Sequence, residues 1–362
     1  MPPRPGEIGC RDLIRLARYR INGLQRRIKP CIGLADLSWS WRCRVNMTVR
    51  DLLRMRRETH SIRKHRADPH HLALVIEGGG MRGVVASAMA TALQKRGLLN
   101  SFDSIHGSSA GACAGAYFLA GQAGLSTRTY YEDINNRRFI NRWRPAIGRP
   151  ILDTHFLIDH VMRVIKPLDV NQILIAGDVL HIVTTDAQSG EARIYNQFRD
   201  VEHFFAILKA SITIPVIAGA PVEVGGVRLI DGGMVQQIAL QSAILAGASH
   251  VLALMTRKQG ELERGGPTLQ FALESWLLRL FLNAKLAAVY RDRNQSINDV
   301  LTFIQRASQG PRIEAIVRPA NASHIDRLTT DGALLRTADQ EAQRAVFDYL
   351  DGAAAFEKSE AG

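Results

Sequence analysis

The sequence lacks an apolar run long enough to cross a membrane. A spanning helix needs about 20 predominantly apolar residues, and the best candidate, residues 271–290, carries Glu274, Arg279 and Lys285. The amino-terminal segment also lacks a compact apolar run followed by a small-residue cleavage site, which is the pattern of a secretory signal. We therefore expect neither a membrane-spanning helix nor a secretory leader.

Cysteine is scarce as well. The four cysteines form no Cys-x-x-Cys pair, and three of them, Cys10, Cys31 and Cys43, lie in one irregular segment, with Cys113 apart. This pattern argues against a zinc site and against a disulfide framework, and no acidic cluster resembles a calcium site. We expect a protein that works without a metal or another cofactor, in a reducing, cytoplasmic setting.

Acidic residues are few in the first part of the chain, which explains most of its formal net charge of +12. Residues 1–70 hold seventeen Lys and Arg against six Asp and Glu, whereas the charges of residues 71–362 nearly balance. The basic excess therefore belongs to an extension and says little about the substrate of the body. We expect no nucleic-acid partner.

The composition, 46% hydrophobic and 22% charged over 362 residues, is typical of a globular protein. We divide the chain into a basic N-terminal extension (residues 1–70), a catalytic domain (71–260) and a mostly helical C-terminal region (261–362). Apolar residues recur every three or four positions over residues 11–28 and indicate an amphipathic basic helix. We expect residues 1–66 to associate peripherally with anionic membranes. The alternative is a helix packed against the body with its arginines in solvent.

Short apolar runs alternate with helical patterns along the body. A buried strand is predicted at Leu72–Ile76, and Val85, Met89 and Leu93 then form a helical stripe that ends before Gly97. Further strands are predicted at residues 102–106, 179–185, 192–195, 222–230 (a hairpin), 251–255 and 313–317. This alternation predicts an α/β fold in which a sheet lies between layers of helices.

A tight turn is predicted after the second strand, at Gly107-Ser108-Ser109-Ala110-Gly111. The pattern G-x-S-x-G between a strand and a helix is typical of a nucleophile elbow, where small flanking residues such as Gly107 and Gly111 let the turn expose the Ser109 hydroxyl. The following helix N-terminus favours a developing oxyanion. The pattern also occurs by chance in Gly- and Ser-rich loops, so its context decides.

A glycine run after the first strand provides that context. It comprises Gly78, Gly79, Gly80, Met81, Arg82 and Gly83, and its N–H groups can converge with Ser109 at the same end of the sheet as an oxyanion hole. The glycines also fit the dinucleotide motif G-x-G-x-x-G, which needs an acidic residue at the carboxyl end of the next strand. Because the only nearby acid, Asp103, stands at the beginning of that strand, we favour acyl transfer over a dinucleotide-dependent oxidoreductase.

A serine nucleophile needs a base, and two residue types compete for that role. His250 lies late enough for a Ser-Asp-His order, but it immediately precedes a predicted strand, and we expect the histidines to be structural. Asp231 ends a strand and is followed by Gly232 and Gly233, so its carboxylate can approach another backbone closely. Taken alone, Asp-Gly-Gly is more often a plain turn.

Together, these motifs resemble those of the patatin-like phospholipase family. The glycine loop, the G-x-S-x-G elbow and the D-G-G turn are intact and in the family's order between about Leu74 and Thr256, and residues 210–215 are also similar to the family's approach to its aspartate. The resemblance implies a three-layer α/β/α sandwich and a Ser-Asp dyad of Ser109 and Asp231 without histidine. It also implies oxyanion N–H groups from the glycine loop, and an arginine, Arg82, that braces the loop or contacts a head group.

The resemblance implies a lipid acyl hydrolase of the phospholipase A, lysophospholipase or carboxylesterase type, with a lipid or another ester as substrate. An ordinary aspartate is a weak base, so we expect burial to raise the pKa of Asp231. Esters are favoured over peptides because alkoxides leave with less help than amines. We expect the acyl channel to be lined by Phe156, Leu157, Val161, Met162 and residues 276–281.

Two other functions stay open at this point. A dinucleotide-dependent oxidoreductase would bind nicotinamide or flavin and ignore serine-directed phosphonates. A catalytically idle membrane-associated adaptor would keep the basic segment without turnover, although intact Ser109 and Asp231 weigh against it.

Overall fold

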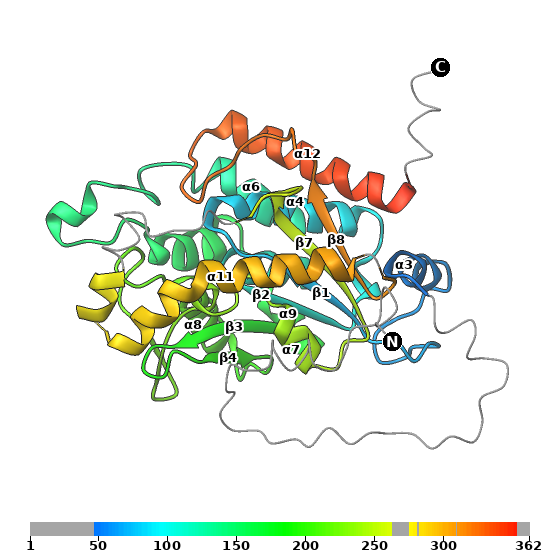
Figure 1. Cartoon of the computed structure of the whole chain (residues 1–362), viewed down its shortest axis with the longest axis horizontal. Coiled ribbons are helices and arrows are strands. Elements are labelled where there is room, and N and C mark those ends of the chain that lie inside the picture. Colours follow the sequence, from blue (N-terminus) through cyan, green and yellow to red (C-terminus); the bar gives the residue numbers. More distant parts are fainter. Residues whose placement is uncertain (1–46, 263–274, 281, 309, 353–362) are drawn as a thin grey trace, which may run out of the picture.

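The computed structural model describes residues 47–262, 275–280, 282–308 and 310–352. The amphipathic helix predicted at residues 11–28 lies outside them. Within the described ranges the chain forms one eight-stranded sheet flanked by helices (Figure 1). None of the helices in these ranges has the combination of length and apolar character that crossing a membrane requires.

The sheet has the strand order β5-β6-β3-β2-β1-β7-β8, and β4 pairs with β3. Within β3-β2-β1-β7-β8 the neighbouring strands run parallel. The pairs of β3 with β4, of β3 with β6 and of β5 with β6 are antiparallel. Every strand predicted from the sequence is present, with small shifts at its ends. The bounds are β1 Leu72–Ile76, β2 Ser104–Ser108, β3 Leu180–Asp186, β4 Ala192–Tyr195, β5 Val222–Val224, β6 Val227–Asp231, β7 His250–Lys258 and β8 Ile313–Arg318.

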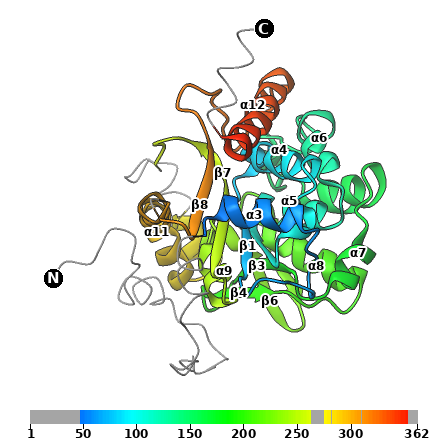
Figure 2. The same ribbon diagram turned by 90° about the vertical axis from the view of Figure 1, so that its right-hand side faces the viewer.

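Helices cover both faces of the sheet (Figure 2). In β1, Leu72, Leu74 and Ile76 face one helical layer, while Ala73 and Val75 face the other. Because both faces are covered, this strand is apolar throughout instead of alternating. The first layer contains α4 Gly83–Lys95, α5 Ala110–Leu119 and α8 Val201–Ile212, and two more helices, α6 Ala123–Glu132 and α12 Gly332–Asp351, pack against α4. The second layer contains α9 Leu240–Leu245 and α11 Ala284–Ala307. The predicted three-layer α/β/α fold is confirmed.

The helix α3 (Val49–Glu58) ties the described part of the N-terminal segment to the body. The Val49 N–H group donates to the Pro311 carbonyl at 3.1 Å. Arg56 is 1% exposed, and its guanidinium lies 2.7 Å from the carboxylates of both Asp68 and Asp103. Residues 47–68 therefore pack as part of the globular body, while the boundary near residue 70 stays a prediction.

We expect Arg56→Met to lower the free energy of unfolding by about 3–5 kcal/mol, because it removes one partner of a largely buried ion-pair network. Arg57→Met is the matched control, since Arg57 is exposed on the same helix, and it should change stability by no more than about 0.5 kcal/mol. Urea unfolding of both variants measures the difference. Equal effects would mean that α3 does not belong to the cooperative unit of the body.

Candidate active site

Ser109 stands at the turn between β2 and α5, as the sequence predicted. Its backbone has φ 53° and ψ −130°, a strained conformation for a residue with a side chain. The flanking glycines allow the turn because neighbouring backbone leaves no space for a Cβ atom. A Cβ on Gly107 would lie 2.5 Å from the Gly111 carbonyl oxygen, and one on Gly111 would lie 2.2 Å from the Ile76 carbonyl oxygen.

The elbow is held in place by Ser211 of α8, whose role the sequence analysis missed. The Ser109 N–H group donates to Ser211 Oγ at 3.0 Å, and the Ser211 hydroxyl donates to the Val183 carbonyl at 2.7 Å. Ser211 is fully buried. It therefore fixes the strained turn to the middle of β3, and only a three-dimensional contact reveals this role.

Two strands meet end to end along β3. In β2, Ser108 pairs with Val183, and in the antiparallel β6, Asp231 pairs with Thr184. Because β4 occupies the other edge of β3 at these residues, β2 and β6 must share one edge. Successive positions on a strand are about 3.3 Å apart. The ends of β2 and β6 therefore converge, which brings Ser109 and Asp231 together.

The Asp-Gly-Gly turn makes this convergence possible. A Cβ on Gly232 would lie 2.1 Å from the Val183 carbonyl oxygen and 3.1 Å from Ser108 Cβ. Gly233 donates its N–H to Asp231 Oδ1 at 2.5 Å, and a Cβ there would lie 2.7 Å from the same oxygen. Close approach to backbone thus requires a glycine at position 232, and a side chain at position 233 would displace the Asp231 carboxylate, so the motif is more than a plain turn.

The carboxylate of Asp231 is buried, with the residue only 3% exposed. Burial raises its pKa to about 6, although the Ser109 side chain, the Gly233 N–H and the charges of Arg293 and Arg327 each act to lower the pKa. Oδ2 is buried and completes no hydrogen bond with any described residue. A buried acceptor without a donor is unfavourable, so Oδ2 is suited to receive a proton from a hydroxyl at Ser109.

The glycine loop leads from β1 into the short helix η1 (Gly80–Arg82) and α4. Within residues 78–83, the N–H groups of Gly79 and Gly80 donate to no acceptor among the described residues. The remaining four N–H groups are engaged: Gly78 with the Gln237 carbonyl, Met81 with that of Arg327, Arg82 with that of Gly79, and Gly83 with those of Gly80 and Met81. Of the six residues that the sequence predicted for the oxyanion hole, only Gly79 and Gly80 therefore keep an N–H group that could donate to a ligand.

The C-terminal region contributes two arginines that the sequence analysis missed. Arg293 of α11 donates to the Gly233 carbonyl and to Gln237 Oε1, both at 2.9 Å. Arg327, between β8 and α12, donates to Gln237 Oε1 at 3.3 Å, while its carbonyl accepts the Met81 N–H at 3.0 Å. Both residues lie outside any recognisable motif. Their positions show that the site is completed by residues far beyond the D-G-G turn.

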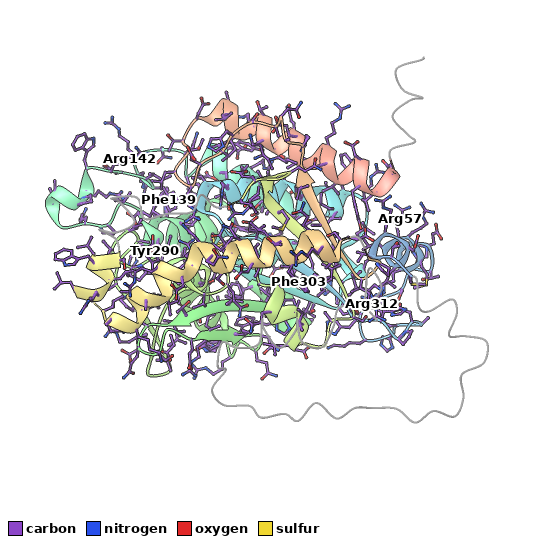
Figure 3. All side chains as sticks on the ribbon, viewed as in Figure 1. Arg57, Phe139, Arg142, Tyr290, Phe303 and Arg312 are labelled. Atoms are coloured by element: carbon purple, nitrogen blue, oxygen red, sulfur yellow. The ribbon has the colours of Figure 1, made fainter. Side chains whose placement is uncertain are left out.

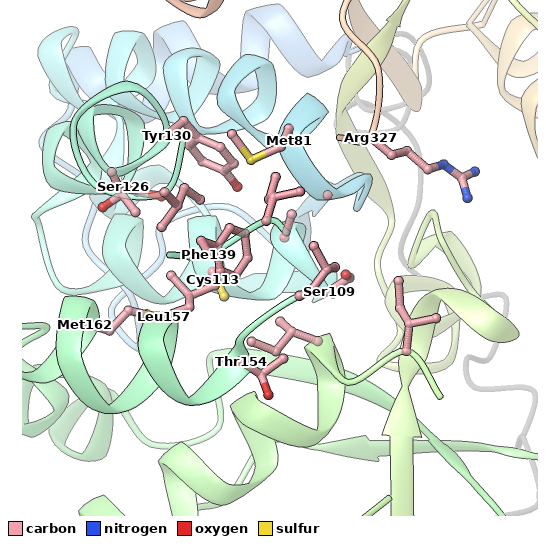
Figure 4. Close-up of a pocket in the computed structure, with 18 of the residues that line it drawn as sticks. Met81, Ser109, Cys113, Ser126, Tyr130, Phe139, Thr154, Leu157, Met162 and Arg327 are labelled. Carbon is pink, nitrogen blue, oxygen red and sulfur yellow. The ribbon is translucent and has the colours of Figure 1, made fainter. Parts of the chain in front are cut away.

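An apolar cavity of about 70 Å³ lies beside Ser109. Figure 4 shows Ser109 between a group of apolar side chains and Arg327, whose guanidinium points away from them. The main apolar contributors are Met81, Cys113, Tyr117, Tyr130, Ile134, Phe139, Ile140, Leu152, Leu157, Met162, Ile212 and Ile214. A pocket that encloses a whole drug-sized ligand measures roughly 300–1,000 Å³, so this cavity would enclose only part of a long acyl chain.

The predicted channel lining is right in part. Leu157 and Met162, on the π-helix η4 (Phe156–Ile165), line the cavity. Phe156 and Val161 of the same helix are instead buried in the core, and Trp276 is 56% exposed and does not line the cavity. Because a π-helix places its side chains on a different period from an α-helix, the sequence could not separate lining residues from core residues.

His250, the alternative candidate for the base, lies at the opposite end of the sheet from Ser109. His250 begins β7 and pairs with Leu72 at the start of β1, whereas Ser109 follows the end of β2. Its Nε2 contacts the Met47 carbonyl at 3.1 Å, and burial lowers its pKa to about 4. These contacts agree with a structural role for His250.

The fold and the site are those of an α/β/α protein with a serine at a strand-to-helix elbow. Residues 74–244 match the family model described as patatin-like phospholipase. This match confirms the resemblance, and it supports lipid acyl hydrolysis as the activity of this part of the chain.

Two individual proteins illustrate how distant the similarities are. The chain is 23% identical over 254 residues to the uncharacterized protein YjjU of Escherichia coli K12, and the alignment covers 69% of each chain. It also resembles the crystal structure of VipD from Legionella pneumophila, with 12% identity and a TM-score of 0.39, over 77% of this chain and 67% of that one. Neither similarity specifies a substrate.

We expect Asp231→Asn to stabilise the fold by up to about 3 kcal/mol at pH 8. The pKa of Asp231 is raised from 3.8 to about 6 on folding, so keeping this group ionised in the folded state costs about 1.4 kcal/mol per pKa unit at any pH well above 6. At about pH 3, below both pKa values, the carboxyl is mostly protonated in both states, and the gain should nearly disappear.

Urea unfolding of both proteins at pH 8 and at about pH 3 measures this effect. Asp348→Asn, at an exposed position on α12, is the control and should leave stability nearly unchanged at both pH values. A loss of stability in Asp231→Asn at pH 8 would contradict the assignment of a destabilising buried charge.

Proposed function

We propose that residues 71–260 form the catalytic domain of a lipid acyl hydrolase that cleaves carboxylic ester bonds, with Ser109 as nucleophile and Asp231 as general base. The observation that carries this proposal is the buried Asp231 carboxylate, with a pKa of about 6, facing the Ser109 elbow. The family match of residues 74–244 supports the same reaction class.

In the first half of the reaction, Asp231 takes the proton of the Ser109 hydroxyl as Oγ attacks the ester carbonyl. The carbonyl oxygen becomes an oxyanion, and the N–H groups of Gly79 and Gly80, which donate to no acceptor among the described residues, donate to it. The positive end of α5, which begins at Ala110, favours the same negative charge. The acyl chain extends into the apolar cavity.

In the second half, the proton on Asp231 goes to the leaving alcohol, and the acyl group stays on Ser109. Water then enters, Asp231 removes its proton, and attack on the acyl-enzyme releases the fatty acid and restores the Ser109 hydroxyl. A carboxylate with a pKa near 6 is a modest general acid and base. It suits an alkoxide leaving group better than an amine, so an ester is the substrate that we propose.

We expect Ser109→Ala and Asp231→Asn each to lower kcat/KM for p-nitrophenyl esters by at least about 10³-fold, because removing one member of a coupled unit disables both. The wild-type kcat/KM should fall tenfold for each pH unit below about 6, as the Asp231 carboxylate becomes protonated. Stopped assays across the pH range measure both effects.

His250→Asn is the control for the base and should keep most of the activity with the same pH profile. Labelling by a fluorescent phosphonate should require Ser109, which separates the hydrolase from a dinucleotide-dependent oxidoreductase and from an idle adaptor. Substantial activity in Asp231→Asn together with loss in His250→Asn would refute the dyad.

We also expect medium or long acyl chains to be preferred over acetate, since the cavity beside Ser109 is mostly apolar and each buried methylene contributes about 0.8 kcal/mol. Leu157→Trp should shift the optimum to shorter chains by filling the cavity. Val164→Trp is the matched control on the same helix, because Val164 is 64% exposed. A p-nitrophenyl ester series with best turnover on acetate would reject the lipid substrate and leave a general esterase.

A further inference from the structure

The segment between α6 and η4 exposes large apolar side chains among arginines. We call residues 137–149 the basic loop. Trp143 is 79% exposed and Ile147 is 72% exposed. No acidic residue occurs between Asp133 and Asp153, while the basic loop carries five arginines: Arg137, Arg138, Arg142, Arg144 and Arg149. Exposed aromatic and aliphatic groups beside several cations are uncommon on a surface that meets only water.

We call Trp143 and Ile147 the tip of the basic loop. Contacts within the loop keep the tip exposed. At its base, Ile140 and Leu152 form an antiparallel bridge, and the Asn141 N–H donates to the Ile151 carbonyl at 2.9 Å. Arg144 braces the turn by donating to the Arg138 carbonyl at 2.6 Å and by pairing with Asp153 at 3.5 Å. These contacts hold the tip away from the core.

Of the other four arginines of the basic loop, one contacts an aromatic ring and three matter for their exposure to solvent. Arg138 lies over the Phe156 ring, 4.4 Å from its centroid. Arg137, Arg142 and Arg149 are also exposed, so three cations of the basic loop are open to solvent on the segment that carries Trp143 and Ile147. The charge of this surface is therefore complementary to an anionic one.

The basic loop is continuous with the candidate active site. Phe139, Ile140 and Leu152, at the base of the loop, line the cavity beside Ser109, and Figure 4 shows Phe139 among the apolar side chains there. In Figure 1 the loop projects at the same end of the molecule as the helix of residues 275–280. That helix exposes Trp276 at 56% and Leu280 at 60%.

We propose that the basic loop docks this end of the molecule onto an anionic lipid surface, with Trp143 and Ile147 in the interface and Arg137, Arg142 and Arg149 against the head groups. Tryptophan favours the membrane–water interface, and each arginine near an anionic bilayer strengthens binding about fivefold. A lipid whose ester reaches Ser109 would then pass along the apolar base of the loop. The inference rests on the proposed lipid substrate.

The basic loop is a better candidate for this surface than the described part of the N-terminal extension. Arg56 pairs with Asp68 and Asp103, and Arg66 also pairs with Asp103. Met47 contacts His250 at the beginning of β7, the end of the sheet away from Ser109. Membrane association through residues 1–66, which we expected from the sequence, is therefore the competing outcome of the vesicle-binding test below.

The test measures vesicle binding of the full chain carrying Ser109→Ala, so that no lipid is consumed. We expect co-sedimentation with phosphatidylcholine vesicles that contain phosphatidylserine, weakening as salt rises, and little binding to phosphatidylcholine alone. Arg142→Glu with Arg149→Glu, and separately Trp143→Ala with Ile147→Ala, should each weaken binding at least about tenfold. The control pair, Arg57→Glu with Arg312→Glu, should bind like the parent.

Figure 3 shows why this control is matched: Arg57 and Arg312 lie at the opposite end of the molecule from Arg142. All are exposed, so both arginine pairs change the net charge equally. Equal weakening by the two pairs would show that total charge, and not the loop, drives binding, and would overturn the proposal. So would a parent protein that does not bind anionic vesicles.

Two further measurements separate this inference from the proposed function. With Ser109 restored, the loop variants should hydrolyse a soluble p-nitrophenyl ester like wild type but lose turnover of an ester embedded in anionic vesicles. A chain that binds through the loop but hydrolyses no ester would refute only the proposed function. If replacing Arg11, Arg15 and Arg18 by Gln abolishes binding while the loop variants bind normally, the extension is the docking element and the loop proposal fails.

Discussion

The candidate active site depends on one steric constraint, which is the crowding of the ends of β1, β2 and β6 against each other and against the middle of β3. A Cβ on Gly78 would lie 2.6 Å from the Ser108 carbonyl oxygen, and those on Gly111 and Gly232 would approach the backbone even more closely. The three glycine motifs are far apart in the sequence, yet each permits one of these contacts. A side chain at any of them would push apart the segments that carry Gly79 and Gly80, Ser109 or Asp231, because backbone atoms cannot yield as side chains do.

The same crowding sets the electrostatics of the site. Convergence buries Asp231 and makes its ionised form unfavourable, which raises the pKa, while Arg293, Arg327 and the Gly233 N–H limit the rise. Without these opposing groups the pKa would rise further, and a smaller fraction of the carboxyl would be ionised and able to accept a proton. The arginines come from beyond residue 244, where the family match ends. The C-terminal region is therefore part of the electrostatic design of the site, although it lacks a motif.

The sequence was sufficient for features that depend on neighbouring residues. Strand and helix patterns, the elbow at Ser109 and the turn at Asp231 are local, and they predicted the α/β/α fold and the meeting of the motifs. Ser211, Arg293 and Arg327 act through contacts with distant segments, so no local pattern marks them. The role of Arg56 was hidden for a different reason: in a basic segment, a buried ion-paired arginine and a solvated one look the same until burial is known.

That ambiguity also changes how the net charge of the protein should be interpreted. The sequence places nearly all of the excess charge in residues 1–70, but a lipid surface responds only to charges within about a Debye length, roughly 8–10 Å at physiological salt. Arg56 and Arg66 are committed to internal ion pairs, whereas Arg142 and Arg149 stand exposed on a loop whose base lines the cavity beside Ser109. In the docking that we propose, a few exposed cations near Ser109 would orient the protein on a membrane more effectively than a larger excess elsewhere, because orientation depends on where the charge is and not on its total.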